Sequence, residues 1–167
     1  SVNKHPLHIV DRIKLSVLTD FALHTKVREQ RFIKDRLERS DQQELLKFCA
    51  AFGKLDMLRF LKDDVGLTAD DFRSGNNDAI ISAAGNGHVP VLRFLKDEVK
   101  LTPDDFRAAN NRAIRRAASH GHLNVLKFLK DEVGLTADDF RDENNLAIQR
   151  AAENGHLDVL KFLKDEV

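Results

Sequence analysis

The chain has 167 residues, of which 42% are hydrophobic and 32% are charged, and its 27 basic side chains balance its 27 acidic ones. That length is typical of one domain, and a net charge of zero gives no overall field that would attract nucleic acid or an anionic membrane. The single cysteine, Cys49, cannot form an internal disulfide, and no segment reaches the roughly 18 consecutive apolar residues of a membrane span. These features favour a cytoplasmic protein in which any site for a charged partner is a local patch.

Residues 1–39 do not share the pattern of the rest of the chain. Their apolar side chains recur at helical spacing, strongly at Leu7, Val10, Ile13, Val17 and Phe21, and weakly at Val27, Ile33 and Leu37. This spacing predicts two helices. We expect them to form a cap over the first repeated unit, or to be a decayed repeat themselves.

From residue 40 onward the sequence repeats with a period of 34 residues. Glycine, phenylalanine and threonine each recur at this interval, at Gly53, Gly87, Gly121 and Gly155, at Phe60, Phe94, Phe128 and Phe162, and at Thr68, Thr102 and Thr136. The units cover about residues 40–73, 74–107, 108–141 and 142–167, the last one incomplete. Such a period predicts an array of stacked units. Residues 161–167 lack the polar replacements of a terminal cap, so we expect the chain to be a fragment of a longer protein.

Each unit is predicted to contain two helices joined by a glycine turn. In the third unit, a first helix (helix A) covers about residues 110–120 and carries Ala113, Ala117 and Ala118, whose small side chains suit close helix packing. Gly121 follows where the helix must stop, and we expect it in the left-handed conformation. A second helix (helix B) then covers about residues 123–130, with apolar side chains again at helical spacing.

The connector between units is predicted to be a third, short helix instead of a β-hairpin. Thr136 precedes Asp139 by three residues, which is the pattern of a helix-capping box, and Pro103 stands at the first helical position of the preceding connector. The neighbouring acid, Asp138, also falls in the first turn, where the helix dipole favours it. We expect Phe140 to anchor this connector against the adjacent unit.

Residues 147–163 resemble the core of an ankyrin repeat. They contain residues 151–156, Ala-Ala-Glu-Asn-Gly-His, which match the family's Ala-Ala-x-x-Gly-His motif, and the resemblance covers about residues 40–167. It implies an all-α, ankyrin-like solenoid of stacked helix pairs. A tetratricopeptide array has the same period, but its pattern relies on Trp and Tyr, which this chain lacks.

Two segments depart from the ankyrin pattern. The family's Thr-Pro-Leu-His start of helix A is replaced by residues such as 112–115, Arg-Ala-Ile-Arg, and its β-hairpin finger is replaced by the short helical connector. Because the finger carries much of the family's binding surface, the family's contact positions do not transfer directly. The Leu-Thr-x-Asp-Asp-Phe-Arg connectors are similar to those of ankyrin proteins in intracellular bacteria and large amoebal viruses.

Several regularly placed residues are of types that bind metals or act in catalysis, but a structural role explains each of them better. His88, His122 and His156 occur once per unit, so they lie about 10 Å apart and cannot share a metal ion. We expect each to hydrogen-bond the turn backbone. Cys49 occupies a position where the other units have a buried alanine, and no base is placed to activate it.

The repeated polar pairs are likewise interpreted as structural. The Asp pairs at 70–71, 104–105 and 138–139 stand at helix starts, where dipole electrostatics explain them without catalysis. The Asn pairs at 76–77, 110–111 and 144–145 are interpreted as a left-handed turn residue followed by a helix cap. Stacked at the repeat spacing, they are expected to form a hydrogen-bonded ladder. No catalytic residue, cofactor site or metal site is predicted.

The positions that differ between units are the candidates for recognition, because a repeat array uses its constant residues for folding. They gather on helix A, and the resemblance implies that they line a concave face: Asp78, Ser82, Asn86, Arg112, Arg115, Arg116, His120, Leu146, Gln149, Arg150 and Asn154. Four of these are arginines, which indicates a locally basic centre suited to an acidic protein surface. Nucleic acid is disfavoured because no exposed aromatic residue is predicted and acidic connectors flank the arginines.

We therefore expect a non-catalytic protein–protein interaction module that is monomeric, does not bind membranes and is cytoplasmic. The alternative is that the array is the targeting or substrate-recruiting arm of a larger enzyme or secreted effector, which would place it in a host cytosol. The active domain would then lie outside this sequence.

Overall fold

The computed structural model describes residues 38–167, which form helices and no strand. The helices are α3 (Arg39–Ala51), α4 (Leu55–Phe60) continued by a π-helical turn (Leu61–Val65), α5 (Ala69–Gly85), α6 (Val89–Asp97), α7 (Pro103–Phe106), α8 (Ala108–Ser119), α9 (Leu123–Asp131), α10 (Ala137–Glu153) and α11 (Leu157–Asp165). The predicted all-α class is confirmed. The cap expected over residues 1–39 lies outside the described residues, apart from its last two.

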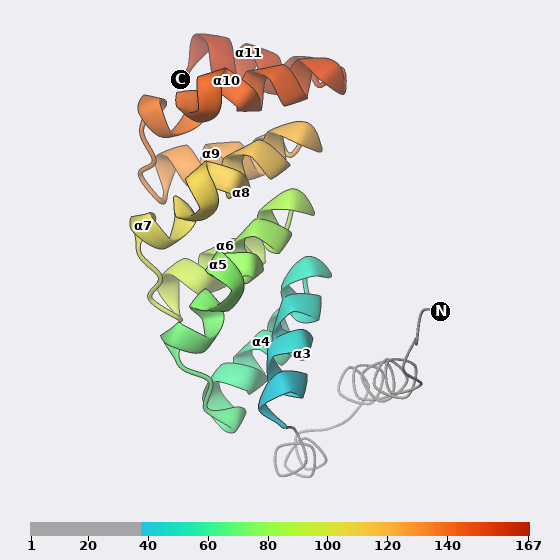
Figure 1. Cartoon of the computed structure of the whole chain (residues 1–167), viewed down its shortest axis with the longest axis vertical. Coiled ribbons are helices and arrows are strands. Elements are labelled where there is room, and N and C mark those ends of the chain that lie inside the picture. Colours follow the sequence, from blue (N-terminus) through green and yellow to red (C-terminus); the bar gives the residue numbers. More distant parts are fainter. Residues whose placement is uncertain (1–37) are drawn as a thin grey trace, which may run out of the picture.

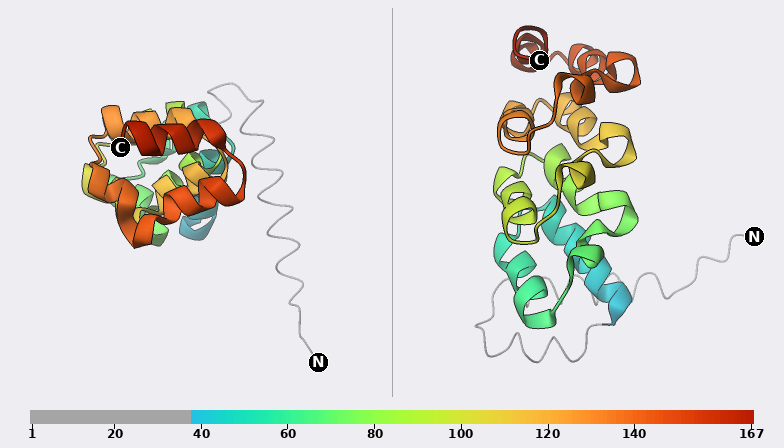
Figure 2. Two further views of the ribbon diagram at one scale, coloured as in Figure 1. Left: turned by 90° about the horizontal axis from the view of Figure 1, so that it is seen from above. Right: turned by 90° about the vertical axis from the view of Figure 1, so that its left-hand side faces the viewer.

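The helices stack in two layers (Figure 1). One layer holds α3, α5, α8 and α10, which contain the helix A segments, and the other holds α4, α6, α9 and α11, the helix B segments; we call them the A layer and the B layer. Viewed from the side, each helix pair lies on the pair before it (Figure 2). The predicted solenoid of stacked helix pairs is therefore confirmed.

Small side chains let the A-layer helices pack closely. Ala113, Ala117 and Ala118 are all buried, and Ile114 fills the space beside them. In the B layer the equivalent role falls to larger residues such as Leu126, which is fully buried between units. The apolar side chains join into one continuous core along the array, so each unit relies on its neighbours for burial.

The glycine turns behave as predicted, and they also bind neighbouring units together. Gly121 has a φ of 75°, in the left-handed region that favours glycine. The ring of His156, from the next unit, lies against it, because a Cβ on Gly121 would stand 2.6 Å from His156 Nδ1. His156 Nε2 donates to the carbonyl oxygen of Ser119 at 3.0 Å. His88 and His122 make the same contact to Ala51 and Gly85. The expected bond to the turn backbone is thus confirmed, and the turn that each histidine bonds is that of the preceding unit.

The connectors are short helices, as the capping pattern predicted. At Thr136 the backbone N–H donates to Asp139 Oδ2 at 2.7 Å, and the hydroxyl donates to the same oxygen at 3.0 Å. Thr68 and Thr102 begin the other two connectors in the same way. Phe140 is buried against Phe162 of the following unit, with ring centroids 6.2 Å apart, so its predicted role as an anchor is also confirmed.

The turn between each connector and helix A differs from the prediction. Three successive residues there have left-handed backbone angles, at residues 75–77, 109–111 and 143–145. The second asparagine of each pair was expected to cap helix A, but a cap needs an extended backbone and an accepting side chain. Asn77 and Asn111 are left-handed, and their Oδ1 atoms have no hydrogen-bond partner. The cap assignment is therefore wrong.

The expected asparagine ladder exists only in part. Asn110 Nδ2 donates to Glu143 at 2.7 Å, and Asn111 Nδ2 donates to Asp142 at 3.0 Å. These asparagines therefore bond acidic residues of the next unit and not its asparagines. The bonds offset some of the cost of holding non-glycine residues in the left-handed region.

Candidate protein-binding surface

Five of the six paired aspartates of the connectors form ion pairs with arginines. Arg73 donates from Nε to Asp105 of the next unit at 2.9 Å and from Nη1 to Asp70 of its own connector at 3.0 Å. The same arrangement recurs one unit later, where Arg107 bonds Asp139 and Asp104, and Arg39 pairs with Asp71 at the start of the array. These carboxylates are therefore not free for acid–base chemistry or cation binding. The sequence analysis missed this ladder, although its arginines recur every 34 residues.

The ladder also fixes the charge state of the inner aspartates. Partial burial raises the pKa of Asp105, but hydrogen bonds from Arg73 and Thr102 outweigh it, and the net result is a pKa below the usual value. Asp139 is shifted in the same direction by Arg107 and Thr136 against the effect of burial. Both carboxylates are thus held ionised.

A second set of ion pairs links the B-layer helices. Arg59 donates to Glu98 at 2.9 Å, and Arg93 pairs with Glu132 in the same way one unit later. These pairs cross from one unit to the next on the exposed side of the B layer. Here too the arginines already have carboxylate partners.

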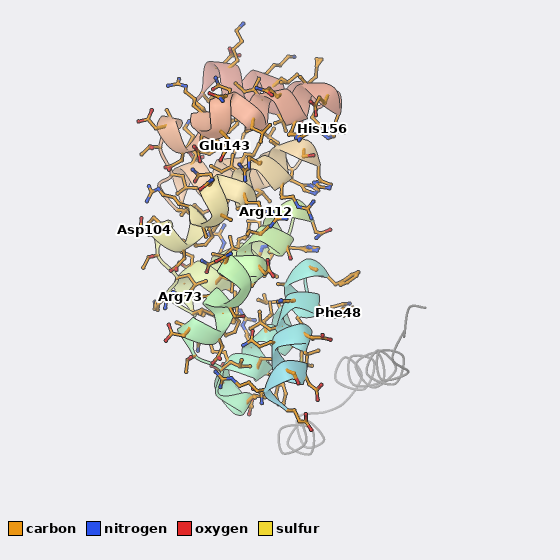
Figure 3. All side chains as sticks on the ribbon, viewed as in Figure 1. Phe48, Arg73, Asp104, Arg112, Glu143 and His156 are labelled. Carbon is orange, nitrogen blue, oxygen red and sulfur yellow. The ribbon has the colours of Figure 1, made fainter. Side chains whose placement is uncertain are left out.

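Two arginines differ from all of these. Arg112 and Arg116 project from α8 in the A layer, are exposed, and make no side-chain hydrogen bond or ion pair with any residue in the range 38–167. They line a hollow of about 550 Å³ between α8 and α10, together with Arg115, Ser119, Leu146, Arg150, Glu153 and Asn154. Figure 3 shows Arg112 on the A layer, away from the connectors that carry Arg73 and Asp104.

The side chains around this hollow are held in place by local contacts. The stem of Arg116 crosses Gly85 of the preceding unit, where an added Cβ would lie 3.3 Å from Arg116 Cβ. Arg115 donates to the Ala109 carbonyl oxygen at 3.1 Å and lies 3.8 Å from Glu143. Arg150 pairs with Glu153 at 2.8 Å. Of the four arginines predicted to form the basic centre, two are thus partly neutralised and two are unpaired.

The other predicted site residues lie on the same layer. Asp78 is half-buried and forms an ion pair with Lys47 at 3.3 Å, and Ser82 is half-buried beside it. Several of the exposed polar side chains bond their own backbone: Asn86 and Asn154 bond carbonyls four residues earlier, His120 bonds the Arg116 carbonyl, and Gln149 bonds that of Asn144. Leu146 is half-buried in the hollow. These residues line the surface, while the free charge comes from Arg112 and Arg116.

Two phenylalanines on the same layer were missed. Phe48 and Phe52, at the end of α3, have ring centroids 4.4 Å apart, and Phe52 is 60% exposed. The expectation that no aromatic side chain is exposed is therefore wrong. Phe48 falls in the 34-residue register of Ser82 and Arg116, and Phe52 in that of Asn86 and His120. This register could have revealed them from the sequence, had the first unit been compared with the others.

The described residues contain no cluster of metal ligands, and their cysteine is buried. Among residues 38–167, no three histidine, cysteine or acidic side chains are grouped as metal ligands. Burial raises the pKa of the Cys49 thiol to about 12, so it stays protonated near neutral pH. No helix in this range is long and apolar enough to cross a membrane.

Comparison with known proteins agrees with this architecture. A profile of ankyrin repeats in three copies matches residues 46–139. The chain is also similar to a solved structure, that of the yeast ribosomal protein Rps3 in complex with its chaperone Yar1, with 24% identity over 78% of this chain and 95% of the other and a TM-score of 0.63. No curated protein sequence gives a significant match. Since the profile covers more than half of its residues, the chain belongs to the ankyrin-repeat family.

Proposed function

We propose that this chain is a non-catalytic protein–protein interaction module that binds an acidic surface of its partner through the exposed face of the A layer. The ankyrin repeats support a binding role, and the solved structure similar to this chain contains a chaperone bound to its client. The binding face is taken to be the concave side of the array, and the chain is taken to be a cytoplasmic monomer.

The observation that carries this proposal is the contrast between paired and unpaired arginines. Other arginines of the array bond a carboxylate one unit away, as Arg73, Arg107, Arg59 and Arg93 do. Arg112 and Arg116 stand one helical turn apart on α8 without such a partner. A planar guanidinium binds a carboxylate through two parallel hydrogen bonds, so two adjacent free guanidiniums suit a partner that presents two carboxylates.

Nucleic acid fits this surface less well. Binding strength depends on how many phosphates the basic side chains neutralise, and only two arginines of the hollow are unpaired. Glu153 lies in the same hollow, and exposed aspartates such as Asp104 occur on the connectors. The alternative, in which the array is the targeting arm of a larger enzyme or secreted effector, places the chemistry outside these residues and uses the same binding face.

A charge-reversal experiment tests the proposal. The tagged chain and its Arg112→Glu/Arg116→Glu variant are each used to capture partners, which are quantified by mass spectrometry. We expect the double variant to lose the partners while its circular dichroism spectrum stays unchanged, because both side chains are exposed. The matched control is Lys127→Glu/Lys161→Glu, which makes the same charge change at exposed B-layer positions. Equal capture by both double variants would show that the A-layer arginines do not bind the partner.

A further inference from the structure

One surface carries the exposed Phe52, the half-buried Phe48 and the two unpaired arginines. Phe48 precedes Arg116 by two full repeats and therefore projects from the same position of helix A. Phe52 has the same relation to His120. Figure 3 shows Phe48 near the end of α3 and Arg112 on α8, two units further along the same layer. The A layer thus carries an aromatic pair at one end and free positive charge near the other.

The aromatic pair has the properties of an anchoring site. Phe52 is 60% exposed, and within residues 38–167 the other large apolar side chain that is comparably exposed is Leu157, on the B layer. The Phe48 and Phe52 rings lie against each other with centroids 4.4 Å apart. Together they present an apolar patch, the kind of surface that aromatic and aliphatic anchors of a partner cover.

The unit between the two sites carries no unpaired negative charge at its outward positions, so it would not repel an acidic segment of a partner. Its outward positions are Ser82 and Asn86, which are uncharged, and Asp78, whose charge is neutralised by Lys47 at 3.3 Å. An acidic chain lying across this unit would meet no unpaired carboxylate at these three positions. Two helix-packing steps of about 10 Å each separate the Phe48 position from that of Arg116, a span of about 20 Å.

We infer that the partner contributes a single linear segment that runs along the A layer, with an apolar side chain on Phe48 and Phe52 and two carboxylates on Arg112 and Arg116. This inference rests on the proposed function. The 20 Å span corresponds to about six residues of an extended segment at about 3.3 Å per residue, or to about thirteen residues of a helix at 1.5 Å per residue. The partner is thus defined by an apolar residue and an acidic pair at one of these two spacings.

Selection from a random library of 20-residue peptides, panned on the whole chain, tests this inference. We expect enriched peptides to combine two acidic residues with one Phe, Leu or Trp, separated by about six or about thirteen positions. Fluorescence anisotropy then measures an enriched peptide against variants of the chain. Phe52→Ser and Arg112→Glu/Arg116→Glu should each weaken binding about tenfold or more, as expected for anchors of an interface. The controls Leu157→Ser and Lys127→Glu/Lys161→Glu should leave binding within about twofold, since they lie outside the A layer.

The outcomes separate this inference from the proposed function. Acidic peptides that respond to the arginine variant but not to Phe52→Ser would overturn the two-anchor segment and leave the acidic binding face standing. The same conclusion would follow if each half of an enriched peptide bound as tightly as the whole. Failure to enrich any peptide would overturn the linear segment alone, because a folded acidic surface is not represented in the library. Apolar peptides that ignore Arg112 and Arg116, or tighter binding of a 20-nucleotide oligothymidylate, would overturn both.

Discussion

The interrupted asparagine ladder predicts that one substitution will stabilise the array. In the third unit Asn111 donates to Asp142 of the next unit at 3.0 Å, and in the first unit Gln43 accepts a hydrogen bond from Ser74. Asn77 occupies the same register as Gln43 and Asn111, but its partner position holds Ala108, which has no polar atom to offer. Asn77 is only 8% exposed, and its side chain makes no hydrogen bond to another described residue of the kind that joins Asn111 to Asp142.

Replacing Ala108 with asparagine should supply that partner. Asparagine is isosteric with the Asp142 side chain, which accepts a hydrogen bond from Asn111 Nδ2, and its Oδ1 can accept from Asn77 Nδ2 in the same way. One hydrogen bond contributes about 1 kcal/mol net. We therefore expect Ala108→Asn to raise the free energy of unfolding by about 1 kcal/mol, which for a chain of this length raises the Tm by about 2–4 °C.

Urea denaturation followed by circular dichroism measures the change. The control is Ala108→Leu, which has a similar shape but no atom that can accept a hydrogen bond, and should give a smaller gain. A second control combines Ala108→Asn with Asn77→Gly, which keeps the left-handed backbone and removes the donor, and the gain should then disappear. An equal gain in the asparagine and leucine variants, or one that survives loss of Asn77, would refute the reasoning.

Three further predictions concern the packing between units and the buried titratable groups. Leu126→Ala should lower the free energy of unfolding by about 2–5 kcal/mol because Leu126 is fully buried between units, while Leu157→Ala, at an exposed position, should change it by less than about 1 kcal/mol; equal losses would mean that the interface between units is misplaced. Burial lowers the pKa of His122 despite its bond to Gly85, so the unfolded chain takes up a proton first as the pH falls. Stability should be complete above about pH 6.5 and decline below it, and His122→Asn should flatten this slope in urea titrations between about pH 6.5 and 5. The Cys49 thiol, with a pKa of about 12 and no exposure, should react with a thiol reagent only at the rate of unfolding, and rapid labelling of the native chain would contradict this.

Local features of the fold were predictable because they depend on residues close together in the sequence. A left-handed residue is needed wherever helix A stops, so Gly121 identified the turn. The capping box at Thr136 and Asp139 needs only three residues of spacing, so the helical connector was predicted as well. The asparagine cap failed because the same residue type suits both a cap and a left-handed turn, and the packing of the next unit decides between them.

Contacts between units were harder to predict, because both partners repeat and the sequence does not state which copy bonds which. His156 was expected to bond a turn backbone, but the sequence did not indicate that the acceptor is Ser119 of the preceding unit. The ladder from Arg73 to Asp105 went unnoticed for the same reason. The exposure of Phe52 also depends on tertiary structure, since its register shows only which face it shares.

The sequence by itself determined the period, the order of short helices and glycine turns, and the layer on which the non-repeated side chains lie. The tertiary structure alone decided which of those side chains are free to bind. Arg116 and Arg150 occupy the same register of the repeat, yet Arg150 is paired with Glu153 and Arg116 has no partner among the described residues. The physical reason is that a charge is available only when no opposite charge lies within reach, and reach is set by how the units pack in space.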